Sequence, residues 1–333
     1  MNKIIFCKIF KNFKTMFSFK HGTPFSIING GQYDDKILYY DEEDSTDEII
    51  EMDPIQVLRK NDFFKNNTKT KRKYNNFLTQ FKKNPTYDTI AYDIIAQRKG
   101  KELDFVTGES LDLIPNYISV DKRTTVYITG PSGTGKTYFA CQFLRRYKEA
   151  FPDRPIYIFT NAVDDPTIKE CSNFSPHLIN LRETITNEKG KEKYKLLEQP
   201  LAPDDFEDCA VLFDDIQYIE HKELRKNLLT LHDALLGCGR KKNVTVVITS
   251  QTVTDYLRTR LILNESEWVV IYPKSGLTRG LDYFFRSYLG IKEKSEIMKR
   301  ILHAPSRWVC LHTRNPQFAF YTSGGFMFNY GYQ

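Results

Sequence analysis

Several features that would assign a protein class at once are missing from this sequence. No apolar run approaches the roughly 20 residues that a membrane-spanning helix needs, so no transmembrane helix is predicted. The six cysteines stand singly, without a C-x-x-C pair, which argues against a disulfide framework or a zinc ribbon and favours a reducing, intracellular setting. No internal repeat is present. The histidines of the second half also lack partners spaced for a metal site or a Ser-His-Asp arrangement: His177, His221, His232, His303 and His312.

The net charge is also small. Lys and Arg number 48 against 42 Asp and Glu, a net of +6 in 333 residues, which permits an anionic partner without requiring one. Hydrophobic residues make up 41% and charged residues 27%, which is typical of a folded, soluble protein. A chain of 333 residues allows one large core with an appendage, or two small domains.

Residues 1–110 differ from the rest in composition and charge pattern, and we interpret them as an N-terminal extension. The first twenty residues contain five Lys and no acid, with apolar side chains at helical spacing, a basic amphipathic pattern. Contact with a membrane surface and a targeting role are alternatives for such a pattern. The absence of Arg and the interrupted apolar stretch favour packing on a protein core instead.

Two blocks of opposite charge follow in the extension. Residues 34–53 hold ten acidic residues against one Lys, and residues 59–83 hold nine basic residues against one Asp. Such blocks, with few branched apolar residues, indicate a solvated linker, so the extension is expected to be partly disordered. The basic run Lys69–Lys73 (KTKRK) leaves open contact with DNA phosphates or a nuclear-import signal.

Near Thr124, short β-rich runs begin to alternate with helical stretches, a pattern that predicts a parallel sheet covered by helices. Mostly uninterrupted apolar runs, as expected for strands buried on both faces, occur at residues 125–129, 156–160, 210–213, 244–249 and 268–272. Helices are expected over residues 136–147, 222–236 and 292–302.

The remaining segments complete the predicted domain, residues 111–333. Residues 308–313 and 318–322 are expected to form a C-terminal β-hairpin, and the Lys- and Glu-rich insert 186–199 a surface loop or exposed helix end. The predicted fold class is α/β, with a mainly parallel central sheet flanked by helices.

The first predicted strand runs directly into a phosphate-binding loop. The residues Gly130-Pro131-Ser132-Gly133-Thr134-Gly135-Lys136-Thr137 match G-x-x-x-x-G-K-[ST], in which backbone N–H groups wrap the phosphates, the lysine reaches the β and γ phosphates and the last hydroxyl binds Mg²⁺. Glycine is needed because a side chain would block the close approach of backbone to phosphate. The following helix points its positive dipole end at the anion. The loop therefore predicts binding of ATP and Mg²⁺, with Lys136 also acting in catalysis and Thr137 as a metal ligand.

A second acidic strand supports this site. Residues 209–215 (CAVLFDD) are an apolar run ending in two carboxylates, as a Walker B segment does. Asp214 is expected to hold Mg²⁺ through its water shell. Asp215 stands next to it, where a carboxylate can polarise the attacking water, and is our candidate general base.

The strand at 244–249 finishes at Ser250-Gln251, and its carboxyl end is expected beside the phosphates. Gln251 is then placed to hydrogen-bond the γ-phosphate or the lytic water. Arg240, just before that strand, is a candidate arginine finger reaching a neighbouring subunit's nucleotide, with Arg258 and Arg260 as rivals and a solvated basic turn as the alternative interpretation.

Taken in order, these motifs resemble one family, the FtsK/HerA-type DNA-packaging ATPases of large nucleocytoplasmic DNA viruses, which are P-loop NTPases of the additional-strand group. The resemblance rests on YITGPSGTGKT (127–137), VLFDDI (211–216) and GCGRKKNVTVVITSQT (237–252) and covers residues 120–275. It implies a ring-forming motor that threads double-stranded DNA into a capsid, with the position of Arg240 as a proposed finger and that of Gln251 as a sensor. Asp-Asp in place of Asp-Glu departs from the wider group but resembles its viral branch.

The predicted function is accordingly an ATP-driven double-stranded DNA translocase that packages a viral genome, an ATPase acting in the virion or at a viral assembly site in the host cytoplasm. Its expected partners are other copies in a homo-oligomeric ring, DNA held by nonspecific backbone contacts, and a capsid component. Alternatives are a nucleotide-gated assembly scaffold with little hydrolysis, which Asp215 in place of Glu leaves open, or a translocase or helicase of a mobile element. A nucleotide kinase is disfavoured because no Arg-rich lid follows.

Overall fold

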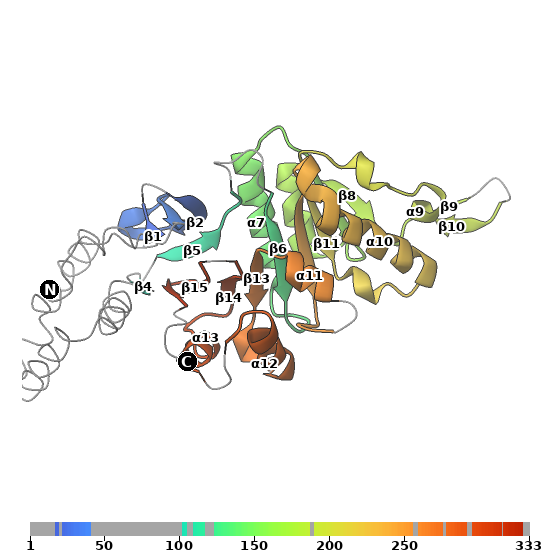
Figure 1. Cartoon of the computed structure of the whole chain (residues 1–333). Coiled ribbons are helices and arrows are strands. Elements are labelled where there is room, and N and C mark those ends of the chain that lie inside the picture. The colour runs from blue at the N-terminus through green and yellow to red at the C-terminus, as the bar shows by residue number, and fades with distance from the viewer. Residues whose placement is uncertain are drawn as a thin grey trace, which may run out of the picture.

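The computed structural model describes residues 17–19, 22–40, 102–104, 109–116, 123–186, 190–255, 259–275, 278–291, 295–314 and 316–328. A ten-stranded sheet runs through them (Figure 1). In sheet order its strands are β4 (Glu102–Asp104), β16 (Gly324–Met327), β15 (Phe318–Tyr321), β14 (Val309–His312), β13 (Trp268–Ile271), β6 (Thr125–Thr129), β12 (Thr245–Ser250), β11 (Ala210–Asp214), β7 (Ile156–Thr160) and β8 (His177–Asn180).

The sheet has a parallel and an antiparallel half. From β13 to β8 all neighbours are parallel, whereas β13, β14, β15, β16 and β4 pair antiparallel in succession. Strand β12 lies between β6 and β11, with Thr249 opposite both Ile128 and Asp214. The carboxyl ends of these three strands therefore meet at one edge, which positions the site.

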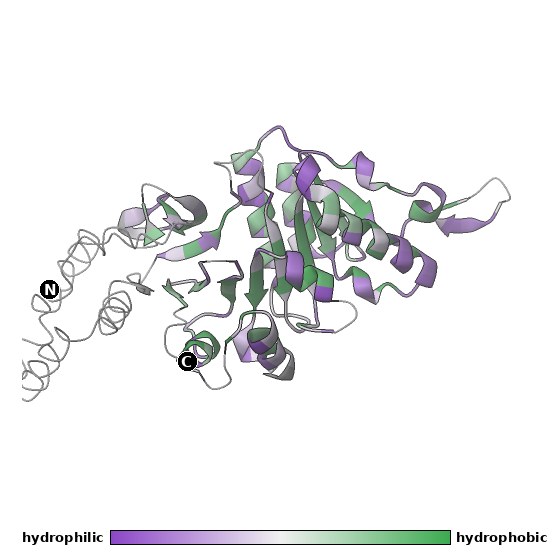
Figure 2. Ribbon diagram, in the orientation of Figure 1, coloured by the Kyte–Doolittle hydropathy of each residue, from purple (hydrophilic) through white to green (hydrophobic). Residues whose placement is uncertain are grey.

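Helices cover both faces of the parallel half. Val126 and Ile128 of β6 face the core that contains Phe143 and Leu144, while Tyr127 between them faces the core of the other side, as the period of two dictates. On the first face lie α7 (Lys136–Ala150) and α8 (Pro166–Glu170); on the second lie α10 (Lys222–Cys238), α11 (Arg260–Glu265), α12 (Thr278–Ser287) and α13 (Glu296–Leu302). Figure 2 shows that the central strands are mostly hydrophobic and that the helices carry both hydrophobic and hydrophilic residues.

Short 3₁₀ turns link these elements at Gly31–Tyr33, Cys171–Phe174, Pro203–Asp205, Ile216–Tyr218, Gly239–Lys242 and Pro273–Ser275. In the part of the chain that the structure describes, no helix is both long and apolar enough to cross a bilayer.

A second, four-stranded sheet is built largely from the N-terminal extension. It comprises β1 (Phe17–Ser18), β3 (Ile37–Tyr40), β2 (Thr23–Asn29) and β5 (Ser110–Leu113), in that order. Phe25 of β2 is fully buried, and its ring packs on those of Trp268 and Phe318. Residues 17–19 and 22–40 therefore belong to the folded core, which differs from the extension expected over 1–110.

Other expectations for the extension are only partly covered by the structure. Of the basic amphipathic start, Phe17 is buried against Phe25 and Phe318. The acidic block is described only up to Tyr40, where it forms β3. Residues 1–16, the basic block and the Lys69–Lys73 run lie outside the described residues.

The predicted α/β fold class is confirmed, and all five predicted strands of the core are present with ends shifted by at most one residue. The C-terminal hairpin is confirmed as β14 and β15. The insert 186–199 forms part of a second hairpin, β9 (Thr184–Thr186) with β10 (Glu192–Tyr194), followed by α9 (Lys195–Glu198). This hairpin extends away from the body of the molecule (Figure 1).

One covalent feature runs against the sequence analysis, which argued against a disulfide framework because the cysteines stand singly. Cys141 of α7 and Cys171 of the following 3₁₀ turn form a disulfide, with their Cα atoms 6.1 Å apart. Both residues are buried. The bond ties the helix after the phosphate-binding loop to the segment after β7.

Candidate functional site: a phosphate-binding loop over two carboxylates

The predicted phosphate-binding loop connects β6 to α7. Gly133 and Gly135 have φ angles of 76° and 100°, a left-handed conformation that side chains disfavour. The Gly130 N–H donates to the Ser250 carbonyl oxygen at 3.1 Å, which ties the loop to the end of β12. The first turn of α7, starting at Lys136, then leaves its unpaired N–H groups facing the loop.

The Lys136 side chain is folded back over this loop. Its ammonium donates to the Pro131 carbonyl oxygen at 3.2 Å and lies 3.9 Å from the Asp215 carboxylate. Only 6% of the side chain is exposed. A buried ammonium that contacts one loop carbonyl oxygen and one carboxylate is suited to bind a phosphate that replaces these partners.

Asp214 ends β11 below the loop and is held by three hydroxyl groups. Thr137 and Thr249 donate to its Oδ1 at 3.2 and 2.8 Å, and Thr160 donates to its Oδ2 at 2.9 Å. The structure thus brings the two predicted metal ligands, Thr137 and Asp214, into contact.

This donor set fits Mg²⁺. The ion usually takes one or two protein oxygens and completes its octahedron with water and substrate phosphates, and a threonine hydroxyl beside a carboxylate under a phosphate-binding loop meets that requirement. A protein-only cage is not needed, and among the described residues no cluster of three His, Cys, Asp or Glu side chains is found.

Asp215 follows β11 in a left-handed conformation, φ 48°, which Asp tolerates better than most residues. Its N–H donates to the Thr249 hydroxyl at 2.9 Å. Its Oδ1 is buried and has no hydrogen-bond partner within the described part of the chain. Burial raises the pKa of this carboxyl above its usual range, with Asp214 adding to the rise and Lys136 and Gln251 opposing it. Both features suit a group that accepts a proton from a bound molecule.

Gln251, predicted from its place after β12, lies in contact with this carboxylate. Its amide Nε2 donates to Asp215 Oδ2 at 3.4 Å. A side chain that touches the candidate base from the neighbouring strand can respond to whatever occupies the space beside it.

The structure does not bring Arg240 into this cluster. It belongs to the 3₁₀ turn Gly239–Lys242, which precedes β12, whereas the phosphate-binding loop adjoins the other end of that strand. Six residues of strand separate the two ends by about 20 Å. Arg240 is exposed, so within one subunit it is remote from the site. Of its rivals, Arg258 lies outside the described residues, and Arg260 begins α11 with an exposed side chain.

Three residues of the site were not predicted. Thr160 and Thr249 hold Asp214 from the adjoining strands, and their position at carboxyl ends of parallel strands was a usable signal. Arg307 donates to the Gly133 carbonyl oxygen at 2.7 Å, although it lies far from the loop in the sequence. No motif indicated it.

The class of fold follows from this geometry. The phosphate-binding loop joins β6 to α7, the two carboxylates end β11, and the extra strand β12 lies between β6 and β11. The chain therefore has the core of a P-loop NTPase of the additional-strand group.

Comparisons with known proteins then place it in a family. The chain is 31% identical over 204 residues to "Uncharacterized protein V3" of Sputnik virophage, a match that covers 61% of this chain and 76% of the relative. It belongs to the same family as this virophage protein. Residues 124–261 also match the model of the Zot family, described as zonular occludens toxin.

Solved structures give weaker matches. The genome-packaging NTPase B204 of Sulfolobus turreted icosahedral virus 2, in complex with AMP, is 12% identical with a TM-score of 0.40, over 60% of this chain and 96% of that chain. The pCW3 conjugation coupling protein TcpA, with ATPγS, is 13% identical with a TM-score of 0.38, over 68% and 66% respectively. Likenesses at this level carry no argument about function.

Proposed function

We propose that this chain is an ATP-driven translocase of double-stranded DNA that packages a viral genome into its capsid. The observation that carries the proposal is the contact between the Thr137 hydroxyl and the Asp214 carboxylate, 3.2 Å apart beneath the phosphate-binding loop. This is the arrangement that a Mg²⁺-bound triphosphate requires. Kinship with a virophage protein supports a viral setting, and the FtsK/HerA-type motifs supply the expectation of DNA and a capsid.

The chemistry we propose is hydrolysis of the γ-phosphate. Bound Mg²⁺ would neutralise charge that develops on the phosphates. The loop N–H groups and Lys136 bind and orient the triphosphate, and Asp215 takes the proton of the attacking water. Gln251, which touches Asp215, reports the loss of the γ-phosphate through the segment that follows β12.

The assembly we propose is a homo-oligomeric ring at a viral assembly site or in the virion. Because Arg240 is exposed and lies roughly 20 Å, the length of β12, from its own phosphate-binding loop, we assign it to the nucleotide of a neighbouring subunit. DNA passes through the ring on nonspecific backbone contacts, and a capsid component receives it.

The test is steady-state hydrolysis of Mg-ATP by the purified chain, with and without long double-stranded DNA, at two salt concentrations. The Lys136→Ala variant is the blank. Stimulation by DNA that fades as salt rises supports the translocase, because phosphate contacts release counterions.

A nucleotide-gated scaffold is the second candidate, since an Asp stands where Glu is usual in many relatives of the group. Its carboxylate also lies within 3.9 Å of Lys136, a contact that a nucleotide would compete with. Turnover equal to the blank in every condition, together with intact ATP binding, would favour the scaffold over the motor.

A further inference from the structure

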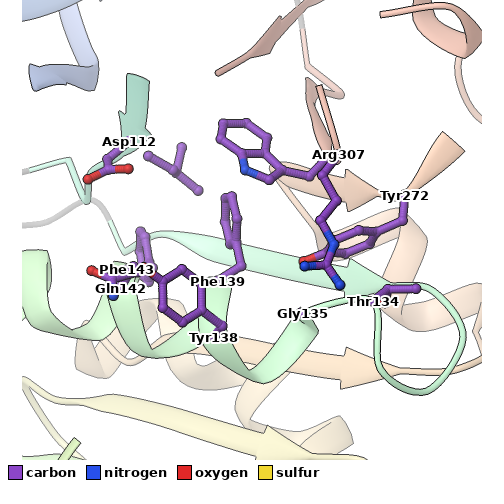
Figure 3. Close-up of a pocket in the computed structure, with 11 residues that line it drawn as sticks. Asp112, Thr134, Gly135, Tyr138, Phe139, Gln142, Phe143, Tyr272 and Arg307 are labelled. Carbon is purple, nitrogen blue, oxygen red and sulfur yellow. The ribbon is translucent and has the colours of Figure 1, made fainter. Parts of the chain in front are cut away.

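A cavity of about 220 Å³ opens beside the phosphate-binding loop (Figure 3). Its lining includes Thr134 and Gly135 of the loop, Tyr138 and Gln142 of α7, and Arg307 and Trp308 before β14. The lining does not include Asp214, Asp215 or Gln251. The cavity and the carboxylates thus adjoin different parts of the same loop.

The walls of this cavity are largely aromatic. Trp308 packs its ring edge-on against Phe139, 5.0 Å between centroids, and the ring of Tyr272 is buried behind the loop. Tyr138 is 56% exposed, which leaves a large ring in water at the cavity's edge. An aromatic ring at the edge of a cavity is well suited to stack on a flat ligand.

Arg307 adds a second positive charge at the loop. Its guanidinium donates one N–H to the Gly133 carbonyl oxygen at 2.7 Å, and Figure 3 shows the side chain reaching down toward Thr134 and Gly135. A guanidinium has five N–H donors in a planar fork that matches phosphate oxygens, so this contact uses a small part of its capacity.

The acidic residue in the lining does not oppose an anion. Asp112 accepts hydrogen bonds from Asn29 at 2.8 Å and from Arg146 at 3.2 Å. Its charge is therefore compensated by Arg146.

We propose that this cavity is the nucleoside subsite, in which Tyr138 and Trp308 stack on the base and Arg307 binds a phosphate from within the same subunit. This proposal rests on the proposed function, since it assumes a nucleotide in the loop. The γ-phosphate end faces Asp215 and Gln251, so the nucleoside leaves the loop on the side of Thr134 and Gly135. The residues before β14, far from the P-loop in sequence, thereby complete the nucleotide site.

The test compares two ligands that the enzyme does not hydrolyse by the proposed route, Mg-ADP and Mg-pyrophosphate, by isothermal titration calorimetry. Tyr138→Ala should lower the affinity for ADP by about 5- to 150-fold, the range expected for a base stacked on an aromatic side chain. It should leave the affinity for pyrophosphate unchanged. Tyr138→Phe should restore ADP binding. Arg307→Ala should lower the affinity for both ligands by about 10-fold or more, because it removes a charge-assisted contact to phosphate.

A matched control is Tyr283→Ala, which removes another exposed tyrosine, 39% accessible on α12, away from the cavity lining. It should bind both ligands as the parent does. If Tyr138→Ala behaved like this control, or weakened both ligands equally, the nucleoside subsite would be wrong while the phosphate-binding loop stood. Failure of the parent chain to bind either ligand would overturn the proposed function as well.

Discussion

The Lys136 ammonium lies 3.9 Å from the Asp215 carboxylate, so the residue expected to hold phosphate is paired with the residue expected to accept the proton. An incoming triphosphate offers Lys136 a stronger, multiply charged partner. In the mechanism we propose, the carboxylate would then lose a cation that lowers its pKa and become a stronger base. The ion pair would thus couple nucleotide binding in the loop to the basicity of Asp215.

Lys136→Ala should abolish tight binding of ATP. The side chain supplies a charge-assisted hydrogen bond worth about 1.5–3 kcal/mol, or about 10- to 150-fold in affinity, and isothermal titration calorimetry measures it. Lys169→Ala is the control, because Lys169 is 61% exposed on α8 and pairs with Asp164. Equal affinity for ATP in the two variants would show that Lys136 does not bind the nucleotide.

Asp215→Asn should keep ATP binding and lose turnover. Asn preserves the shape and tolerates the left-handed backbone, but it cannot take the proton, and loss of a general base costs about 10²- to 10⁴-fold. Binding and steady-state hydrolysis are measured on the same preparation. Asp164→Asn, at a carboxylate that is 92% exposed, should behave as the parent. Normal hydrolysis by Asp215→Asn would show that another group accepts the proton.

The same substitution should also change how stability depends on pH. Burial raises the pKa of Asp215, so the folded state holds this proton to higher pH than the unfolded state, whose carboxyl ionises near pH 4. The contribution of the protonated carboxyl is complete below about pH 4 and is lost as pH rises through the raised pKa. Asp215→Asn should therefore gain stability relative to the parent as pH rises.

Urea denaturation at a series of pH values measures this difference. If the free energy of unfolding of Asp215→Asn instead falls relative to that of the parent as pH rises, Lys136 outweighs burial and the pKa of Asp215 is lowered. Asp164→Asn, being almost fully exposed, should show no comparable trend.

The parallel half of the fold could be predicted because its signals are local. Apolar runs such as residues 125–129 need both faces covered, and the glycine loop fixes where α7 starts. The strands β8 and β16 were missed for a physical reason. His177–Asn180 has no fully buried side chain, and Gly324–Met327 begins with two glycines, which disfavour strands in isolation. Strand β8 forms because it pairs with β7 across the intervening α8, and β16 is held between the adjacent β15 and the distant β4.

The site shows the same division. Lys136, Thr137 and Asp214 sit in motifs whose spacing reflects shared chemistry. Arg307 reaches the loop only because the antiparallel half folds back beside β6, through β13 and β14. The burial of Phe25 against Trp268 is equally nonlocal, which is why β2 and β3 were included in the N-terminal extension and not in the core.

The disulfide between Cys141 and Cys171 should contribute measurably to stability. It closes a loop of 30 residues, for which the chain-entropy model gives about 3.6 kcal/mol at 25 °C. Peptide mapping without reductant should recover the two cysteines cross-linked, and the double variant Cys141→Ala/Cys171→Ala should lower the free energy of unfolding. Cys238→Ala, at an exposed free cysteine, is the control. Two alkylated thiols in the folded chain would refute the bond.

Arg240 provides the test of assembly. Because it lies at the end of the sheet opposite its own phosphate-binding loop, it can assist hydrolysis only in a neighbouring subunit, where an arginine finger is worth about 10³- to 10⁵-fold. Arg240→Ala subunits keep an intact loop, and Lys136→Ala subunits keep an intact arginine. Mixing two inactive preparations should therefore recover ATP hydrolysis, with a maximum at intermediate ratios.

Lys241→Ala, at an exposed neighbour on the same turn, should be active without mixing. If no ratio of Arg240→Ala to Lys136→Ala restores activity, Arg240 does not act across an interface, and Arg260 becomes the next residue to exchange in the same experiment.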